Sequence, residues 1–128
     1  MTAAELRAIP ILNLAFIGDG VFDLLVREHL VASVGGRVGE LNSLKVSLVN
    51  CAAQASAASA ILPMLSDDEL SVYRRGRNAS PRSVSHHSTL SDYHAATGLE
   101  ALFGYLYLSG QRERINELFQ HIISLSNL

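Results

Sequence analysis

Two acidic residues, far apart in the chain, each interrupt an apolar segment that favours a helix. Asp19 lies in Leu-Ala-Phe-Ile-Gly-Asp-Gly-Val over residues 14–21, and Glu100 lies in Thr-Gly-Leu-Glu-Ala-Leu-Phe-Gly-Tyr over residues 97–105. A carboxylate among apolar neighbours is costly to desolvate unless a cation or hydrogen-bond donors receive it. If the two segments cross, both acids could bind one divalent cation, because Mg²⁺ prefers a few carboxylate oxygens together with retained water.

Each acid has a glycine beside it on its predicted helix. Gly18 directly precedes Asp19, and Gly104 follows Glu100 by one helical turn. A glycine inside a helix costs about 1 kcal/mol relative to alanine, so its presence there favours the close approach of two backbones. We therefore expect the helices to cross at Gly18 and Gly104, with the two acids converging at the crossing.

Asp23 follows Asp19 by one turn, so both carboxylates project from one face of their helix. In a supporting role, Asp23 would hydrogen-bond a metal-bound water or face a partner subunit. The structural alternative for these acids is an ion pair with Arg27, Arg74 or Arg77, or a partly solvated position. For Asp23 the supporting and the structural role both stay open.

Positive charge is concentrated in one part of the chain, although the formal net charge is −2. Four of the ten Lys and Arg residues lie between Arg74 and Arg82, and no acid occurs between Glu69 and Asp92. Local charge matters more than the total for attracting a polyanion. The candidate phosphate contacts in this stretch are Arg74, Arg75, Arg77, Asn78, Arg82, His86 and His87.

The composition of residues 76–91, rich in Ser, Arg and His with one proline, predicts a loop. Arginine offers paired donors to phosphate oxygens and glycine lets a backbone approach, so this loop suits contact with a nucleic-acid backbone. Aromatic side chains that would stack on exposed bases occur only at its ends, as Tyr73 and Tyr93, which favours a double-stranded partner. The alternative is an ordinary solvated basic surface.

Length and patterning predict one all-α domain over residues 1–128. The chain is 48% hydrophobic and 17% charged, which is enough to build one core. Apolar positions recur with helical spacing, and no strand pattern competes. The predicted helices cover residues 12–34, 39–62, 66–75, 91–108 and 112–125, with either Ser91 or Asp92 capping the fourth.

Several kinds of protein and site lack their signature in this sequence. No uninterrupted apolar run reaches the roughly 18 residues of a membrane span, and Met1–Pro10 lacks the pattern of a secretory signal. The single Cys51 cannot form an intramolecular disulfide and is predicted to be a buried helix residue. The histidines at 86, 87 and 94 do not have the spacing of a zinc site.

The two acidic segments resemble the motifs of a known family. Residues 14–21 resemble the signature of the ribonuclease III catalytic domain, and residues 100–104 resemble that domain's second acidic motif. The closer resemblance is to the Mini-ribonuclease III branch, which lacks a separate double-stranded RNA-binding domain. It rests on the short length, on Arg-Arg-Gly-Arg-Asn-Ala over residues 74–79, and on residues 88–104. It spans about residues 12–118.

This resemblance implies a homodimeric, all-helical endonuclease that cuts double-stranded RNA with Mg²⁺. Asp19 and Glu100 match the family's catalytic metal-binding pair, whereas Ala15 and Thr97 stand where full-length ribonuclease III has acids. With two carboxylates rather than four, we expect more of the ligands to be water or RNA phosphate oxygens, and weaker metal binding in the free enzyme. The implied products carry a 5′-phosphate and a 3′-hydroxyl.

The resemblance also implies a cellular role: maturation of the ends of precursor 23S ribosomal RNA in a bacterial cytoplasm. A ribosomal protein could present that RNA, and an organelle form without its transit peptide would look the same. One competing function is a non-cleaving RNA-binding or ribosome-assembly protein, which has no need of two buried acids. Another is an all-α nucleotide pyrophosphohydrolase, whose Glu-x-x-Glu and Glu-x-x-Asp pairs are absent here.

Overall fold

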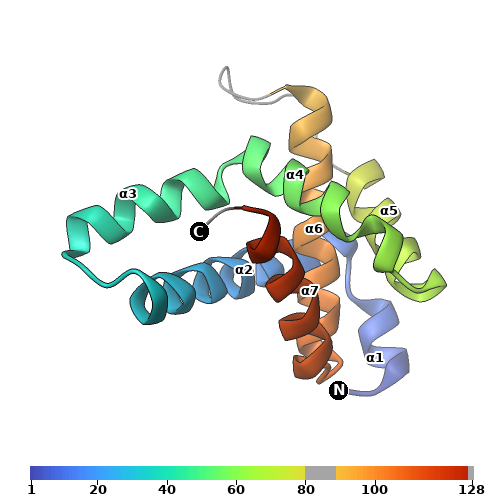
Figure 1. Cartoon of the computed structure of the whole chain (residues 1–128). Helices are drawn as coiled ribbons and strands as arrows, with labels where there is room; N and C mark the ends of the chain where they lie inside the picture. Colours follow the sequence, from blue (N-terminus) through green and yellow to red (C-terminus); the bar gives the residue numbers. More distant parts are fainter. Residues whose placement is uncertain (80–88, 127–128) are drawn as a thin grey trace.

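The computed structural model describes residues 1–79 and 89–126, and the regular secondary structure there is entirely helical, which confirms the all-α prediction (Figure 1). Along the described chain the elements are α1 (Ala3–Ala8), α2 (Ile11–Ser33), α3 (Val38–Val49), α4 (Cys51–Ile61), a 3₁₀ turn (Leu62–Met64), α5 (Asp67–Ala79), α6 (Leu90–Leu108) and α7 (Arg112–Leu125). Helices α2 and α7 lie close to their predicted bounds. Helix α1 has no counterpart among the predicted elements, although Thr2 and Glu5 form a capping box at its start.

Helix α6 stands in the middle of the molecule, with the other helices arranged around it (Figure 1). Phe22 of α2 stacks on Phe103 of α6, with ring centroids 5.5 Å apart, and meets the edge of Phe119 of α7 at 6.0 Å. Both α2 and α7 therefore pack on α6 through one aromatic cluster. The largest fully buried side chains are Phe22, Phe103, Leu30, Ile61, Leu99, Leu102, Leu106, Leu118 and Val26. Their burial fixes how α2 and α6 lie against each other.

The predicted single helix over residues 39–62 is wrong, because the chain breaks at Asn50 into α3 and α4, which are bent by 58°. The Asn50 side chain accepts a hydrogen bond from the backbone N–H of Ala53 at 2.9 Å and so caps α4. Cys51 begins α4 and is only partly buried, contrary to prediction. None of the described helices could by itself span a membrane; the bent pair passes that test by length and composition only.

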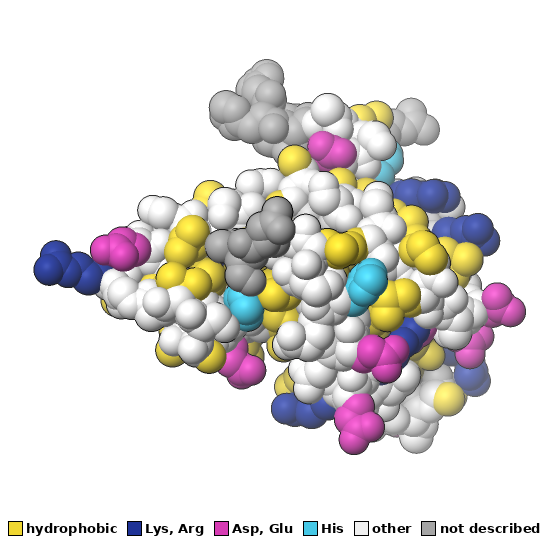
Figure 2. All heavy atoms as spheres, viewed as in Figure 1, with side chains coloured by type: hydrophobic (Ala, Val, Ile, Leu, Met, Phe, Trp, Pro, Cys, Tyr) yellow, Lys and Arg dark blue, Asp and Glu magenta, His cyan; other side chains and the backbone are white. Residues whose placement is uncertain are grey.

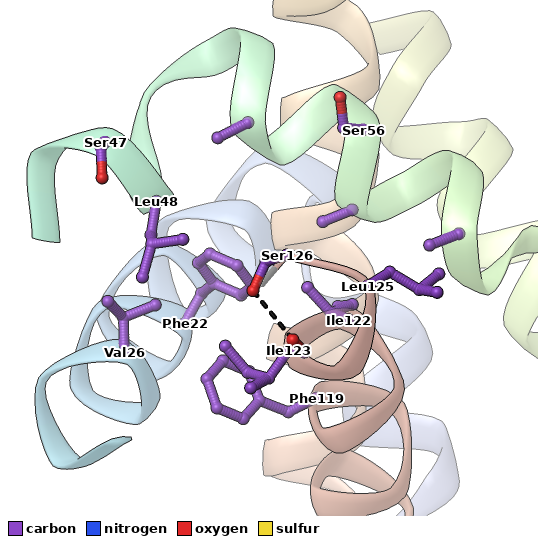
Figure 3. A pocket seen from close by; sticks show the side chains of 13 residues that line it. Phe22, Val26, Ser47, Leu48, Ser56, Phe119, Ile122, Ile123, Leu125 and Ser126 are labelled. Carbon is purple, nitrogen blue, oxygen red and sulfur yellow. Dashed lines mark hydrogen bonds between the residues drawn. The ribbon is translucent and has the colours of Figure 1, made fainter. Parts of the chain in front are cut away.

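Helices α3 and α4 form an arm in which α3 packs loosely over the rest of the molecule, whereas α4 packs closely and has four buried residues, Gln54, Ala57, Ala58 and Ile61. Helix α3 has no buried residue. Beneath the arm lies an apolar cavity of about 310 Å³, with Leu48 on one side and Phe22, Phe119 and Ile122 on the other (Figure 3). Helix α3 is therefore attached to the core less closely than α4.

Helix α5 begins as predicted but is longer. Ser66 and Glu69 form the predicted capping box, and Arg114 of α7 donates to both carboxylate oxygens of Glu69 at 2.8 Å. This arginine holds the pKa of Glu69 below its ordinary value. This ion pair fastens the start of α5 to α7. At its other end the helix continues past the predicted end at Arg75 to Ala79.

The prediction of a loop from residue 76 is wrong for residues 76–79. Gly76 is buried inside α5, where a Cβ would lie 2.7 Å from the Cβ of Ala101 and 3.0 Å from the Cα of Gly98. This glycine permits close helix packing rather than a turn. The predicted cap of α6 is also wrong, since the hydroxyl of Thr89 accepts from the Asp92 N–H. The loop prediction is also wrong for Leu90 and Ser91, which begin α6, whereas residues 80–88 of the predicted loop lie outside the described residues.

Candidate active site

Helices α2 and α6 cross at the two predicted glycines. A Cβ on Gly18 would lie 1.6 Å from the carbonyl oxygen of Glu100, and a Cβ on Gly104 would lie 1.9 Å from the carbonyl oxygen of Leu14. These distances leave room for a hydrogen atom only, so no other residue fits at either position. Because the backbones touch here, Asp19, which follows Gly18, is brought to Glu100.

The carboxyl groups of Asp19 and Glu100 interact directly. Burial raises the pKa of Glu100 to about 8, with further increases from a hydrogen bond to Asp19 and from the negative charge of Asp19. Glu100 is therefore mostly protonated at neutral pH and donates to Asp19, which is exposed. Such a pair gains most from a cation, because a cation favours the second ionisation that burial and repulsion oppose.

A third polar group at this site was not predicted from the sequence. Gln54 of α4 is only 4% exposed, and its amide donates a hydrogen bond to Glu100 that lowers the glutamate's pKa against the larger effects that raise it. Gln54 is the only polar side chain larger than serine in α4. That feature is the one signal in the sequence that could have found it.

The positions that carry acids in full-length ribonuclease III contribute no ligand here. Ala15 is buried, and the hydroxyl of Thr97 donates to the Tyr93 carbonyl of its own helix at 3.0 Å. Across residues 1–79 and 89–126, no group of three or more His, Cys, Asp or Glu residues is placed to hold a metal. Two carboxylates and an amide still fit Mg²⁺, which proteins commonly hold by one or two carboxylates with the remaining ligands from water and substrate phosphates.

Asp23 lies beside two cations. The Nε of Arg27 donates to its Oδ2 at 2.6 Å, and the Nζ of Lys45, on α3, is 3.6 Å from its Oδ1. The ion pair considered for Asp23 is therefore present. In contrast, neither Asp19 nor Glu100 forms an ion pair with any Lys or Arg of the described residues.

The basic residues of α5 lie on a helix that adjoins the acids. Val72 of α5 packs against Ala15 of α2 and Ala101 of α6, and thus next to both acid-bearing segments. The side chains of Arg74, Arg75, Arg77 and Asn78 are exposed, and Figure 2 shows Lys and Arg side chains along the edge of the molecule where α5 lies. The guanidinium of Arg77 lies 5.9 Å from the Tyr73 ring centroid. The predicted contacts Arg82, His86 and His87 fall outside the described residues.

Known proteins resemble this chain over most of its length. The model of the Ribonuclease III domain family matches residues 12–111. Mini-ribonuclease 3 of Symbiobacterium thermophilum is 39% identical over 120 residues, which are 94% of this chain and 92% of that protein. Mini-ribonuclease 3 of Brevibacillus brevis is 40% identical over 114 residues, 89% of this chain and 85% of that protein. A crystal structure of a Fusobacterium nucleatum protein matches with a TM-score of 0.84 at 28% identity, covering 92% of this chain and 96% of that one.

Proposed function

Because this chain belongs to the ribonuclease III domain family, with Mini-ribonuclease 3 proteins among its relatives, it is an endoribonuclease, and we propose that it cuts double-stranded RNA with Mg²⁺ at Asp19 and Glu100. The observation that carries this proposal is the contact between the two carboxyl groups at the Gly18–Gly104 crossing. A protein that only binds RNA gains nothing from two repelling acids in one place, one of them with a pKa of about 8.

In the proposed mechanism the chain holds and orients the reacting groups. Asp19 and Glu100 would hold a divalent cation, which would act as a Lewis acid towards the scissile phosphate and the attacking water. Glu100 would hold it in the ionised form, and the Gln54 amide fixes the orientation of its carboxylate. Asp19 is the more exposed acid and so lies on the substrate side. Of the two roles left open for Asp23, the proposal assigns it a supporting one, in which it holds Arg27 and Lys45 one turn from Asp19.

RNA contact is proposed for the exposed polar residues of α5 together with the following segment. These residues are Arg74, Arg75, Arg77, Asn78, Arg82, His86 and His87. The α5 members among them lie on a helix packed against both acid-bearing helices, which supports contact with the backbone on either side of the cut. Contacts of this kind select the A-form shape of the duplex rather than its sequence.

We propose that the protein acts as a homodimer on precursor 23S ribosomal RNA in a bacterial cytoplasm, where a ribosomal protein could present the RNA. Support for the dimer comes from α2, whose outer face carries Phe16 at 81% exposure and Leu24 at 64%. A two-fold dimer places two sites across one duplex, so that each cuts one strand.

The proposal is tested by Mg²⁺-dependent cleavage of a long RNA duplex, with binding followed in parallel. We expect the wild type to cut the duplex. Asp19→Asn and Glu100→Gln should still bind it, but their cleavage rates should be lower by about 100-fold or more. Glu113→Gln, which removes an exposed acid at the start of α7, is the matched control and should cut normally.

Two outcomes would replace this function. If the wild type binds duplex RNA at every Mg²⁺ concentration but never cuts it, the protein is a non-cleaving RNA-binding protein. If it instead releases mononucleotide from a nucleoside triphosphate, it is a nucleotide pyrophosphohydrolase.

A further inference from the structure

Two cations outside α5 lie near the acid pair, on the opposite side from α5. Arg27 of α2 and Lys45 of α3 both line a cavity of about 280 Å³ between these helices. The other lining residues are Leu30, Val31, Val38, Leu41 and Asn42. Apart from Asn42 the remaining wall is apolar, so the two cations are the groups of this cavity that could bind an anion.

Asp23 connects these cations to the proposed catalytic pair. It pairs with Arg27 through one carboxylate oxygen and with Lys45 through the other. Two positive charges against one negative charge leave a net positive charge at this position. Asp23 follows Asp19 by four residues, which is about 6 Å along the axis of an α-helix. The two cations therefore contact an acid that lies one helical turn from Asp19, which is proposed to hold the divalent cation.

The position of Lys45 differs from that of an ordinary surface lysine. Its side chain is only 18% exposed, and its ammonium is 3.6 Å from Asp23, beyond ordinary hydrogen-bond distance. Within the part of the chain that the structure describes, this ammonium makes no hydrogen bond. The stem is thus held against the protein while the three N–H donors remain available.

We propose that Arg27 and Lys45, positioned by Asp23, bind a phosphate of the RNA backbone next to the one being cut. This inference rests on the proposed function. Helix α2 is flanked by α5 at Ala15 and by α3 beyond Asp23, so the acid pair has cations on both sides. A strand laid along α2 would then contact the arginines of α5, the acids, and Lys45 in turn. Asp23 acts as a positioning residue that holds the two cations at the edge of the site.

The competing structural explanation is that Asp23 and Lys45 only fasten α3 to α2. The dependence of RNA affinity on salt separates the two, because removing a cation that binds a phosphate lowers the slope of log K against log salt by about 1, whereas removing a fastening ion pair does not. Lys45→Met keeps the apolar stem and removes the charge, and Lys45→Arg keeps the charge. Arg112→Met removes one charge at the opposite side of α2, near Leu24, and is the matched control.

We would measure binding of a defined RNA duplex over a range of salt concentrations in an Asp19→Asn background, so that the RNA stays intact. Lys45→Met should weaken binding several-fold and lower the slope by about 1, Arg27→Met with Lys45→Met should lower it by about 2, and Lys45→Arg should restore it. Arg112→Met should leave the slope unchanged.

In cleavage assays with Asp19 intact, Lys45→Met should raise KM more than it lowers kcat. An unchanged slope in Lys45→Met, with cleavage by the wild type intact, would overturn this inference and leave the proposed function standing. A wild type that does not cut duplex RNA would instead overturn the proposed function. A lower melting temperature of Lys45→Met with an unchanged slope would establish the fastening role.

Discussion

At the scale of single residues, the site depends on two acids that disfavour each other's ionisation. Glu100 is half-buried, and Asp19 adds a hydrogen bond and a negative charge, so that the pKa of Glu100 is raised to about 8. Gln54 acts in the other direction and offers a donor to the ionised form. The metal-free and the metal-bound site therefore differ by one proton, the one on Glu100.

We expect metal binding to release this proton. The folded-state pKa of Glu100 is raised from 4.5 to about 8, so its contribution to stability is fully present below about pH 4.5 and is lost as pH rises towards 8. A divalent cation needs the ionised form, so binding at about pH 6.5 should release close to one proton and binding at about pH 9 almost none. Titration calorimetry in buffers with different ionisation enthalpies measures this number.

Glu100→Gln is the control for the released proton, because its side chain cannot ionise. Metal binding to this variant should release no proton from position 100 at either pH. Equal release at both pH values in the wild type would show that Glu100 is already ionised in the metal-free protein.

At the scale of elements, the crossing of α2 and α6 decides whether the two acids meet. The crossing was predictable because a glycine inside a helix is costly and Gly18 and Gly104 each lie next to an acid. The same residue type gave a wrong prediction at Gly76, where a glycine in a polar stretch indicated a turn but serves close packing on α6. Gln54 was not predicted as a site residue, because its isolation among small residues was the only signal and the packing of α4 on α6 is what brings it to Glu100.

Gly18→Ala should separate the helices. Its Cβ would lie 1.6 Å from the backbone oxygen of Glu100, and a backbone cannot rotate away as a side chain can. We expect a loss of about 3 kcal/mol or more in the free energy of unfolding and loss of cleavage. Denaturant unfolding and the duplex cleavage assay measure both effects.

Gly20→Ala provides the comparison on the same helix, since nothing lies within 4 Å of its added Cβ. It should leave the unfolding free energy unchanged or raise it by up to about 1 kcal/mol, through the better helix propensity of alanine. Similar losses in both variants would mean that the contact at Gly18 is not what holds the helices together.

At the scale of the whole molecule, α6 organises the fold and α2 is left with one uncovered apolar face. The core side chains of α2, Phe22, Val26 and Leu30, are buried, whereas Phe16, Leu24 and Val31 are more than 60% exposed. Amphipathic spacing predicted the helix itself. It could not show which apolar side chains turn inward, because apolar side chains lie on the exposed part of α2 as well as on its buried part.

Phe16→Glu should produce a monomer that still folds. The side chain is 81% exposed, so a charge there costs little in the single chain but much in an interface between two copies. Sedimentation or light scattering gives the mass, and circular dichroism checks the helix content. Leu125→Glu, at 60% exposure on α7, is the control that should keep the mass of the wild type. A monomeric wild type would contradict the proposed dimer.

The loose packing of α3 over the apolar cavity gives the two sides of the site unequal local stability. We expect amide groups in the buried part of α6, from Ala96 to Leu106, to exchange with solvent only when the whole protein unfolds. Those of α3, which has no buried residue, become accessible through local opening at a much smaller cost in free energy. Lys45, which contacts Asp23 from α3, therefore lies on the less protected of these two helices, and a phosphate bound there would slow hydrogen exchange in α3 far more than in α6.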